Sequence, residues 1–256
     1  MDHFYVAYHT DIGIKKKTNQ DSILLKGIKD GDQDSLLCVI CDGMGGIEKG
    51  ELASATAVRA FSKWFENVYI QKGSAWTSAE VWSQWADLLA DTNKLLTTYG
   101  EKHHIQLGTT VTVLLITSQN KYVLGHIGDT RVYHFQDHME QLTEDHTFVA
   151  REVRRGNMTA EQAAQDNRRN VLLQCIGVNQ SFTPQFLEGK LGAGDAFLLC
   201  SDGFRHVVTE HEIYMCLKPE KIPDEVAAKK NLIHLAELNK QRRETDNISA
   251  VYIKRK

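Results

Sequence analysis

Residues 36–43 of this chain read LLCVICDG, a run of six apolar residues followed by Asp42 and Gly43. Apolar runs of this length, rich in leucine and β-branched residues, are typical of buried strands, and Asp-Gly is common turn chemistry. The same combination of a strand with an aspartate directly beside it recurs at four further places: Asp21, Asp129, Asp202 and Asp246. The chain therefore pairs strand ends with carboxylates five times.

One Asp-Gly by itself is most often an ordinary turn. Five carboxylates at strand ends could converge on one rim of a sheet sandwich. Carboxylates gathered in one place repel one another and require cations. Ligation by oxygen atoms and water selects Mg²⁺ or Mn²⁺ over zinc.

The remaining sequence predicts strands in blocks with helices between them, which favours an α+β fold with antiparallel sheets in one domain over residues 1–256. Strands are expected at 4–10, 22–28, 36–41, 110–117, 121–127, 131–135, 196–200 and 248–253. The turns between 110–117, 121–127 and 131–135 are short enough for antiparallel neighbours. Helices are expected at 51–69, from the capping box that begins at Thr77, from a second one at Thr209, and at 224–240.

The helix that begins at Thr77 shows an apolar side that is typical of packing against a core. That side contains Trp82, Trp85, Leu88, Leu89, Leu95, Leu96 and Tyr99. We expect the tryptophans to be core residues rather than a platform for a ligand.

Composition excludes several classes of protein. Of 256 residues, 42% are hydrophobic and 25% are charged, which is ordinary for a globular chain. The net charge of −3 disfavours a nucleic-acid-binding protein, and the longest apolar runs are too short to span a membrane. Five cysteines, an odd number lying mostly in apolar runs, predict reduced thiols and a cytoplasmic location.

Six short motifs occur in one order along the chain: Asn19-Gln20-Asp21, Asp42-Gly43-Met44-Gly45-Gly46, Gly108-Thr109-Thr110, Gly128-Asp129-Thr130-Arg131, Ser201-Asp202-Gly203 and Asp246-Asn247. Each motif is weak alone. In this order and spacing, from about Tyr5 to Tyr252, they resemble the PP2C-type (PPM) metal-dependent protein serine/threonine phosphatases of bacteria.

The resemblance implies a four-layer αββα sandwich in which two antiparallel sheets are flanked by helix pairs, with two or three Mn²⁺ or Mg²⁺ ions at one end. Asp42 is similar to the carboxylate that bridges two metals, and Gly43 lends its carbonyl to one of them. Asp202 and Asp246 resemble ligands of the other metal. Asp129, together with Asp202, matches a third-metal site.

Other residues resemble supporting parts of the family site. Asp21 looks like an outer acceptor for metal-bound water, and Gln20 and Asn247 are expected beside it. Lys16 stands where the family has a phosphate-binding arginine, so a point charge replaces a planar fork. Residues 146–175 resemble a flap beside the site. The set expected to carry catalysis is Lys16, Asp42, Asp202 and Asp246.

The activity implied by the resemblance is hydrolysis of phosphoserine and phosphothreonine in proteins by a hydroxide that bridges two metals, without a phospho-enzyme. The expected partners are phosphorylated proteins and a bacterial serine/threonine kinase whose action the chain opposes. A phosphoprotein-binding pseudo-phosphatase is the alternative. Such a module has no need to keep Asp42, Asp202 and Asp246 together. Hydrolysis of another phosphoester is a third reading.

Some conspicuous residues are expected to be structural. Met44 and Ile47 occupy positions where relatives carry a histidine, so a metal-bound water is the expected proton donor to the leaving group. His126 is expected to be a hydrogen-bonded core residue. Cys38 and Cys41 form a C-x-x-C, but an offset of three along a strand places them on opposite faces.

Overall fold

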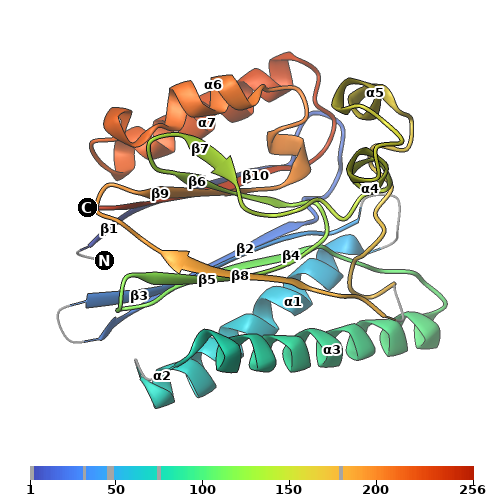
Figure 1. The fold of residues 1–256 in the computed structure, drawn as a ribbon. Coiled ribbons are helices and arrows are strands. Elements are labelled where there is room, and N and C mark those ends of the chain that lie inside the picture. The colour runs from blue at the N-terminus through green and yellow to red at the C-terminus, as the bar shows by residue number, and fades with distance from the viewer. Residues whose placement is uncertain (1–2, 31–32, 45–48, 74–75, 179–180) are drawn as a thin grey trace.

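The computed structural model describes residues 3–30, 33–44, 49–73, 76–178 and 181–256. Within these residues the strands form two antiparallel five-stranded sheets, which lie face to face between two layers of helices (Figure 1). The order is β1-β10-β9-β6-β7 in one sheet and β2-β3-β4-β5-β8 in the other. This is the αββα sandwich of the α+β class that the resemblance implied.

The first sheet contains β1 (Phe4–Asp11), β6 (Arg131–Phe135), β7 (Met139–Gln141), β9 (Ala196–Cys200) and β10 (Ile248–Arg255). The second contains β2 (Asp21–Asp30), β3 (Gln33–Asp42), β4 (Val111–Ile116), β5 (Lys121–Ile127) and β8 (Gln185–Lys190). The α-helices are α1 (Gly50–Trp64), α2 (Ile70–Lys72), α3 (Ser78–His103), α4 (Phe148–Arg154), α5 (Ala160–Gln165), α6 (Glu210–Leu217) and α7 (Glu225–Gln241). A π-helical segment, η1 (Phe65–Tyr69), and two 3₁₀ turns, η2 (Asp202–Phe204) and η3 (Pro219–Lys221), complete the elements.

Alternation along β3 divides its side chains between two apolar layers. Leu36, Cys38 and Ile40 pack between the two sheets with residues such as Phe197. Leu37, Val39 and Cys41 face the helices on the other side. A strand buried on both faces reads as a continuous apolar run because successive side chains point in opposite directions. The two cysteines therefore lie on opposite faces, as predicted.

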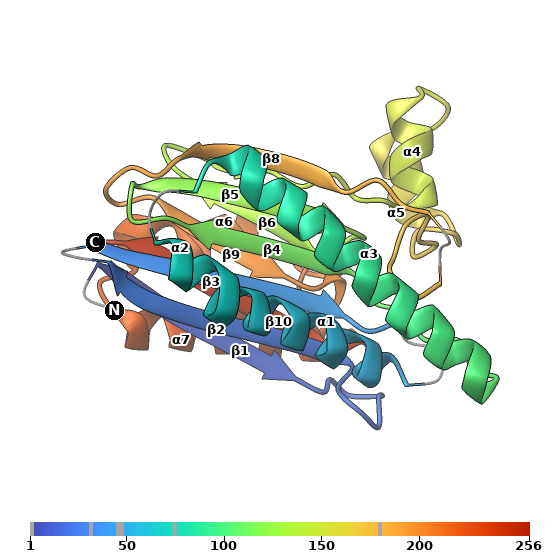
Figure 2. The same ribbon diagram turned by 90° about the horizontal axis from the view of Figure 1, so that it is seen from below.

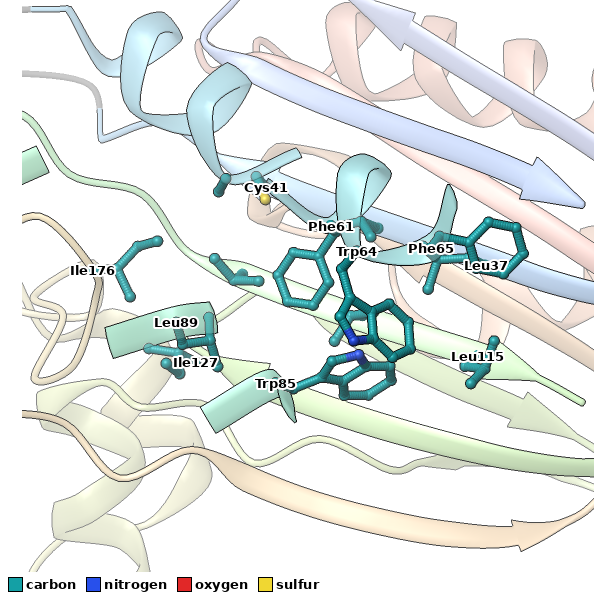
Figure 3. Close-up of a cluster of buried hydrophobic side chains, with 14 of the residues drawn as sticks. Leu37, Cys41, Phe61, Trp64, Phe65, Trp85, Leu89, Leu115, Ile127 and Ile176 are labelled. Atoms are coloured by element: carbon teal, nitrogen blue, oxygen red, sulfur yellow. The ribbon is translucent and has the colours of Figure 1, made fainter. Parts of the chain in front are cut away.

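Helices α1 and α3 lie side by side across the outer face of the β2-β3-β4-β5-β8 sheet (Figure 2). Aromatic rings fill the space beneath them (Figure 3), where Trp85 meets Trp64 and Phe61 edge to face at centroid distances of 5.6 and 5.9 Å. Trp85 is fully buried, which confirms the core assignment. Leu95 was assigned to the same side wrongly, because α3 turns it outward and 60% of it is exposed.

Helices α6 and α7 cover the other sheet, and α4 and α5 lie apart from the layers at one end of the sandwich (Figure 1). The capping boxes at Thr77 and Thr209 are both present: each hydroxyl accepts a backbone N–H three residues later. None of the helices in the described ranges is both long enough and apolar enough to cross a membrane.

The structure departs from the expected elements in three respects. The strands 121–127 and 131–135 are not neighbours, because β5 pairs with β4 and β8 while β6 pairs with β7 and β9. The chain crosses between the sheets at Gly128, where φ is +113° and an added Cβ would lie 2.5 Å from the Thr110 side chain. The predicted helix over 51–69 is present, but it changes from α-helical to π-helical at Phe65, where η1 begins. Strands β7 and β8 were not expected.

Candidate metal centre

The five aspartates singled out by the sequence lie at one end of the sandwich. Asp21 begins β2 and pairs in register with Asp42, the last residue of β3. Asp129 lies in the crossing from β5 to β6, Asp202 lies two residues after the end of β9 at Cys200, and Asp246 precedes β10. Segments far apart in the sequence therefore deliver one carboxylate each to the same place.

Burial and mutual repulsion perturb these carboxyl groups. Burial, followed by the charges of the other four aspartates, raises the pKa of Asp42 well above its usual value. Burial raises the pKa of Asp21 to about 7, and the charge of Asp202 adds to that effect. The pKa of Asp129 also rises to about 7, first through burial and then through the charge of Asp202.

The cluster has unmet polar groups. The Oδ1 atoms of Asp21 and Asp202 are buried and have no hydrogen-bond partner. Lys16 lies beside the cluster, and its Nζ is 2.8 Å from Asp246 Oδ1. Burial by itself lowers the pKa of Lys16, but the hydrogen bond to Asp246 and the neighbouring carboxylates raise it overall. Together with Arg205 and His206, which lie beside Asp129 and Asp202, Lys16 leaves part of the negative charge of the five carboxylates uncompensated.

These atoms suit a hard cation, which takes oxygen ligands. Across the described ranges, no group of three or more His, Cys, Asp and Glu side chains could hold a metal ion in its present arrangement. The donor set is nevertheless the right one, because unpartnered carboxylate oxygens at buried positions require a counter-charge. The residues therefore fit a divalent cation, whose charge would offset the repulsion among the carboxylates.

Backbone contacts fix the loops that carry the aspartates. Thr109 Oγ1 donates to the Asp42 carbonyl at 2.9 Å, and Thr110 Oγ1 accepts the Asp42 N–H at 2.9 Å. Asn247 Oδ1 accepts the Gln20 N–H at 2.9 Å, and its Nδ2 donates to the Ile12 carbonyl at 2.9 Å. Asn247 and Gln20 therefore join the loop before β2 to the loop before β10.

Two glycines allow these loops to approach closely. A Cβ on Gly43 would lie 2.3 Å from the Gly50 carbonyl oxygen and 2.6 Å from the Gln20 oxygen. A Cβ on Gly203 would lie 2.2 Å from the Asn247 oxygen. Any larger residue at either place would force apart the segments that carry Asp42, Asp202 and Asp246.

The sequence reasoning missed a histidine bridge beside the cluster. His206 Nε2 lies 3.3 Å from Asp202 Oδ2, and its Nδ1 lies 3.3 Å from Glu244 Oε2. Glu244 in turn accepts the N–H groups of Thr245 and Asp246 at 2.7 and 2.9 Å. His206 thus links the loop of Asp202 to the loop of Asp246. Its position four residues after Asp202 was a signal that could have been used.

A second network that was missed holds Asp129. Arg131 forms a two-pronged pair with Asp145, at 2.9 Å from Nε to Oδ1 and 2.8 Å from Nη2 to Oδ2. Arg205 Nη2 donates to the Asp129 carbonyl at 2.8 Å and lies 3.4 Å from Asp145 Oδ2. A planar guanidinium suits such multiple contacts. The network ties the β5–β6 crossing to the loop after β9.

The positions considered for a proton donor differ in their surroundings. His126 is fully buried, contacts Thr112 Oγ1 at 2.8 Å and the Glu144 carbonyl at 3.0 Å, and is a core histidine as expected. Burial lowers its pKa to about 3. Met44 is partly buried, whereas Ile47, with Gly45 and Gly46, lies outside the described residues.

A cavity of about 960 Å³ opens from the cluster toward α4 and α5. Asp129 and Asp246 lie on its wall at the cluster, and Val149, Val153 and Ala160 lie on its wall at the helices. The cavity gives a phosphorylated side chain room to reach the carboxylates.

Comparisons with known proteins identify the family. Residues 13–234 match the model of the protein phosphatase 2C family. The serine/threonine phosphatase stp of Listeria monocytogenes serotype 4b is 31% identical over 227 residues, which are 87% of this chain and 86% of that protein. The match to the family model covers most of the chain.

Solved structures share the fold. The serine/threonine phosphatase of S. agalactiae superposes with a TM-score of 0.86 at 26% identity and covers 99% of this chain and 100% of its own. The catalytic domain of the serine/threonine protein phosphatase PstP, solved in complex with two manganese ions, gives a TM-score of 0.78 at 27% identity and covers 98% of both chains. With these five aspartates at one end of an αββα sandwich, the chain belongs to the protein phosphatase 2C family.

Proposed function

We propose that this chain hydrolyses phosphoserine and phosphothreonine in proteins, with two or three Mn²⁺ or Mg²⁺ ions as cofactors. The observation that carries the proposal is the convergence of five aspartates from five segments on one cluster, two of which, Asp129 and Asp246, line the cavity. The family and the phosphatases of similar sequence support it. The manganese ions in the PstP structure support the choice of metal.

Each aspartate has a proposed place in the metal centre. Asp42 and the carbonyl of Gly43 would hold one ion, and Asp202 and Asp246, together with Asp42, would hold a second. Asp129 and Asp202 would hold a third. When bound, the ions would make water acidic enough to attack phosphorus and would neutralise the phosphoryl oxygens.

The chain's own residues orient this chemistry. Thr109 and Thr110 fix the backbone of Asp42, so its carboxylate has a defined position. Asp21 Oδ2 accepts the Ser201 hydroxyl at 3.0 Å, which leaves the unpartnered Oδ1 to accept a proton from water. Lys16 moves from Asp246 to the phosphoryl oxygens, because its flexible ammonium can serve either anion.

The buried thiols take no part in the proposed reaction. Cys41 lies next to Asp42 in the chain, but burial raises its pKa well above the usual value, so the thiol stays protonated. A protonated, enclosed thiol cannot attack phosphorus. The proposed nucleophile is water, and we expect no covalent phospho-enzyme.

The cellular setting is also proposed. None of the five cysteines, all of which lie in the described residues, forms a disulfide, which supports a reducing compartment such as the cytoplasm. The proposed partners are phosphorylated proteins and a serine/threonine kinase whose action is reversed. Residues 1–256 form one phosphatase domain, in which 146–175 act as the flap. The Thr147–Leu172 bridge at the base of this segment supports its treatment as a unit.

Hydrolysis of a phosphothreonine peptide tests the function. Phosphate release is measured with Mn²⁺, with Mg²⁺ and with EDTA, for the parent and for Asp42→Asn. We expect turnover with either metal, none with EDTA, and none in the variant. A parent that binds the phosphopeptide but releases no phosphate under any metal would instead be the phosphoprotein-binding module.

A further inference from the structure

The cavity between the cluster and the flap has a charged wall that the proposed reaction does not use. Most of its basic side chains are already neutralised by partners. Arg131 and Arg205 share Asp145, and Arg154 pairs with Glu144. These ion pairs hold the wall together and have little charge left for a ligand.

Two further arginines on this wall have no such partner. Arg169 follows α5 and Arg243 follows α7, and both are exposed and line the cavity. Within the described part of the chain, neither side chain forms an ion pair with a carboxylate. Arg169 belongs to the flap, whereas Arg243 belongs to the loop that carries Asp246. Two separate segments therefore present uncompensated positive charge to one cavity.

The backbone at Arg243 is unfavourable for an arginine. Its φ is +66°, in the left-handed region that favours glycine. Its N–H bonds to the Lys240 carbonyl and the Glu244 N–H bonds to the Asn239 carbonyl, both at 3.0 Å. This is the turn that ends a helix and usually takes glycine. Glycine is therefore the replacement for Arg243 that this backbone accepts best.

We propose that Arg169 and Arg243 bind the carboxylate of an acidic residue flanking the phosphorylated serine or threonine. The proposal rests on the proposed phosphatase function and adds a substrate class, acidic phosphopeptides. Guanidinium groups match carboxylates in both charge and planar geometry. The wall is shared with Asp129 and Asp246, so the acidic residue lies close to the phosphate in the bound peptide.

The test compares three phosphothreonine peptides of one sequence whose flanking residues are glutamate, glutamine or lysine. The readout is the ratio of kcat/KM between the acidic and the neutral peptide, because a ratio cancels any general loss of activity. We expect the parent to prefer the acidic peptide by about fivefold to tenfold. Arg169→Gln and Arg243→Gln each reduce the ratio, and the double variant brings it to about one.

Two variants separate recognition from structure. Arg243→Gly suits the left-handed backbone, so we expect a higher melting temperature together with a lower ratio. Arg59→Gln is the matched control, since Arg59 is an exposed arginine on α1, outside the cavity. It removes the same charge and should leave the ratio unchanged.

The failures of the two proposals are distinguishable. Normal hydrolysis of p-nitrophenyl phosphate with a peptide ratio of one in the parent overturns the acidic preference and leaves the phosphatase function standing. Fluorescence anisotropy with the same peptides needs no turnover. Equal affinity for acidic and neutral peptides overturns the preference even in a chain that hydrolyses nothing.

Discussion

Replacing Asp129 by asparagine should stabilise the metal-free protein, and increasingly so as the pH rises. Asp129 is 6% exposed, and its pKa rises from 3.8 to about 7 in the folded state. Between these values the folded protein holds a proton that the unfolded chain has released, so stability falls as the pH rises. Above pH 7 the ionised carboxylate is held in the fold at a cost of about 4 kcal/mol.

The size of the effect follows from the same two values. Linkage gives a cost of about 2 kcal/mol at pH 5 and about 4 kcal/mol at pH 8 for Asp129, and none for asparagine. The stability gap between Asp129→Asn and the parent should therefore widen by about 2 kcal/mol over this range. Any fixed cost of the substitution cancels in that difference.

The assay is urea unfolding in EDTA at pH 5, 6, 7 and 8. Asp87→Asn, at an exposed site on α3, is the matched control and should show a gap that stays nearly constant. With saturating Mn²⁺, the widening for Asp129→Asn should shrink, because the cation offsets the repulsion. A gap for Asp129→Asn that is the same at pH 5 and pH 8 in EDTA would refute the reasoning.

Three other outcomes are expected. With Mn²⁺, Lys16→Arg should lower KM for a phosphothreonine peptide and Lys16→Ala should raise it; equal KM values in steady-state assays would make Lys16 a bystander. Iodoacetamide under native conditions should leave turnover intact, because burial raises the pKa of Cys38, Cys41 and Cys200; a folded but inactive Cys41→Ser would contradict this. His126→Gln should keep most activity and the same profile of kcat against pH, since burial lowers the pKa of His126 to about 3; a hundredfold loss confined to peptide substrates would make His126 the acid.

Local chemistry made several elements predictable. The apolar run at 36–41 is buried on both faces and can only be a central strand, and β3 contains it. The Thr77 and Thr209 caps depend on contacts three residues away, so their sequence determines where α3 and α6 begin. The aspartates could be found because strand ends and turns are also local features.

The sequence alone did not predict which distant segments pair in the sheets. β8 (Gln185–Lys190) pairs with the edge of β5, a strand about 60 residues earlier in the chain. The residues of β8 alternate poorly between buried and exposed, so their sequence does not indicate a strand. The short loop at Gly128 predicted a hairpin between the two strands that flank it. The length of a loop does not show which of the two sheets the next strand joins. Leu95 fits an apolar stripe, yet the sheet covers only part of that side of α3.

The candidate site likewise has residues that the sequence predicts and contacts that only the structure shows. The sequence by itself supplied the five aspartates and Lys16, because each carries chemistry recognisable from residue type and neighbours. Only the tertiary structure placed His206 between Asp202 and Glu244, and Arg169 and Arg243 on one cavity. Those relations join residues that are distant in the chain or separated by a turn. The charged side chains interact only because folding brings them close together, and the order of residues does not show which of them will meet.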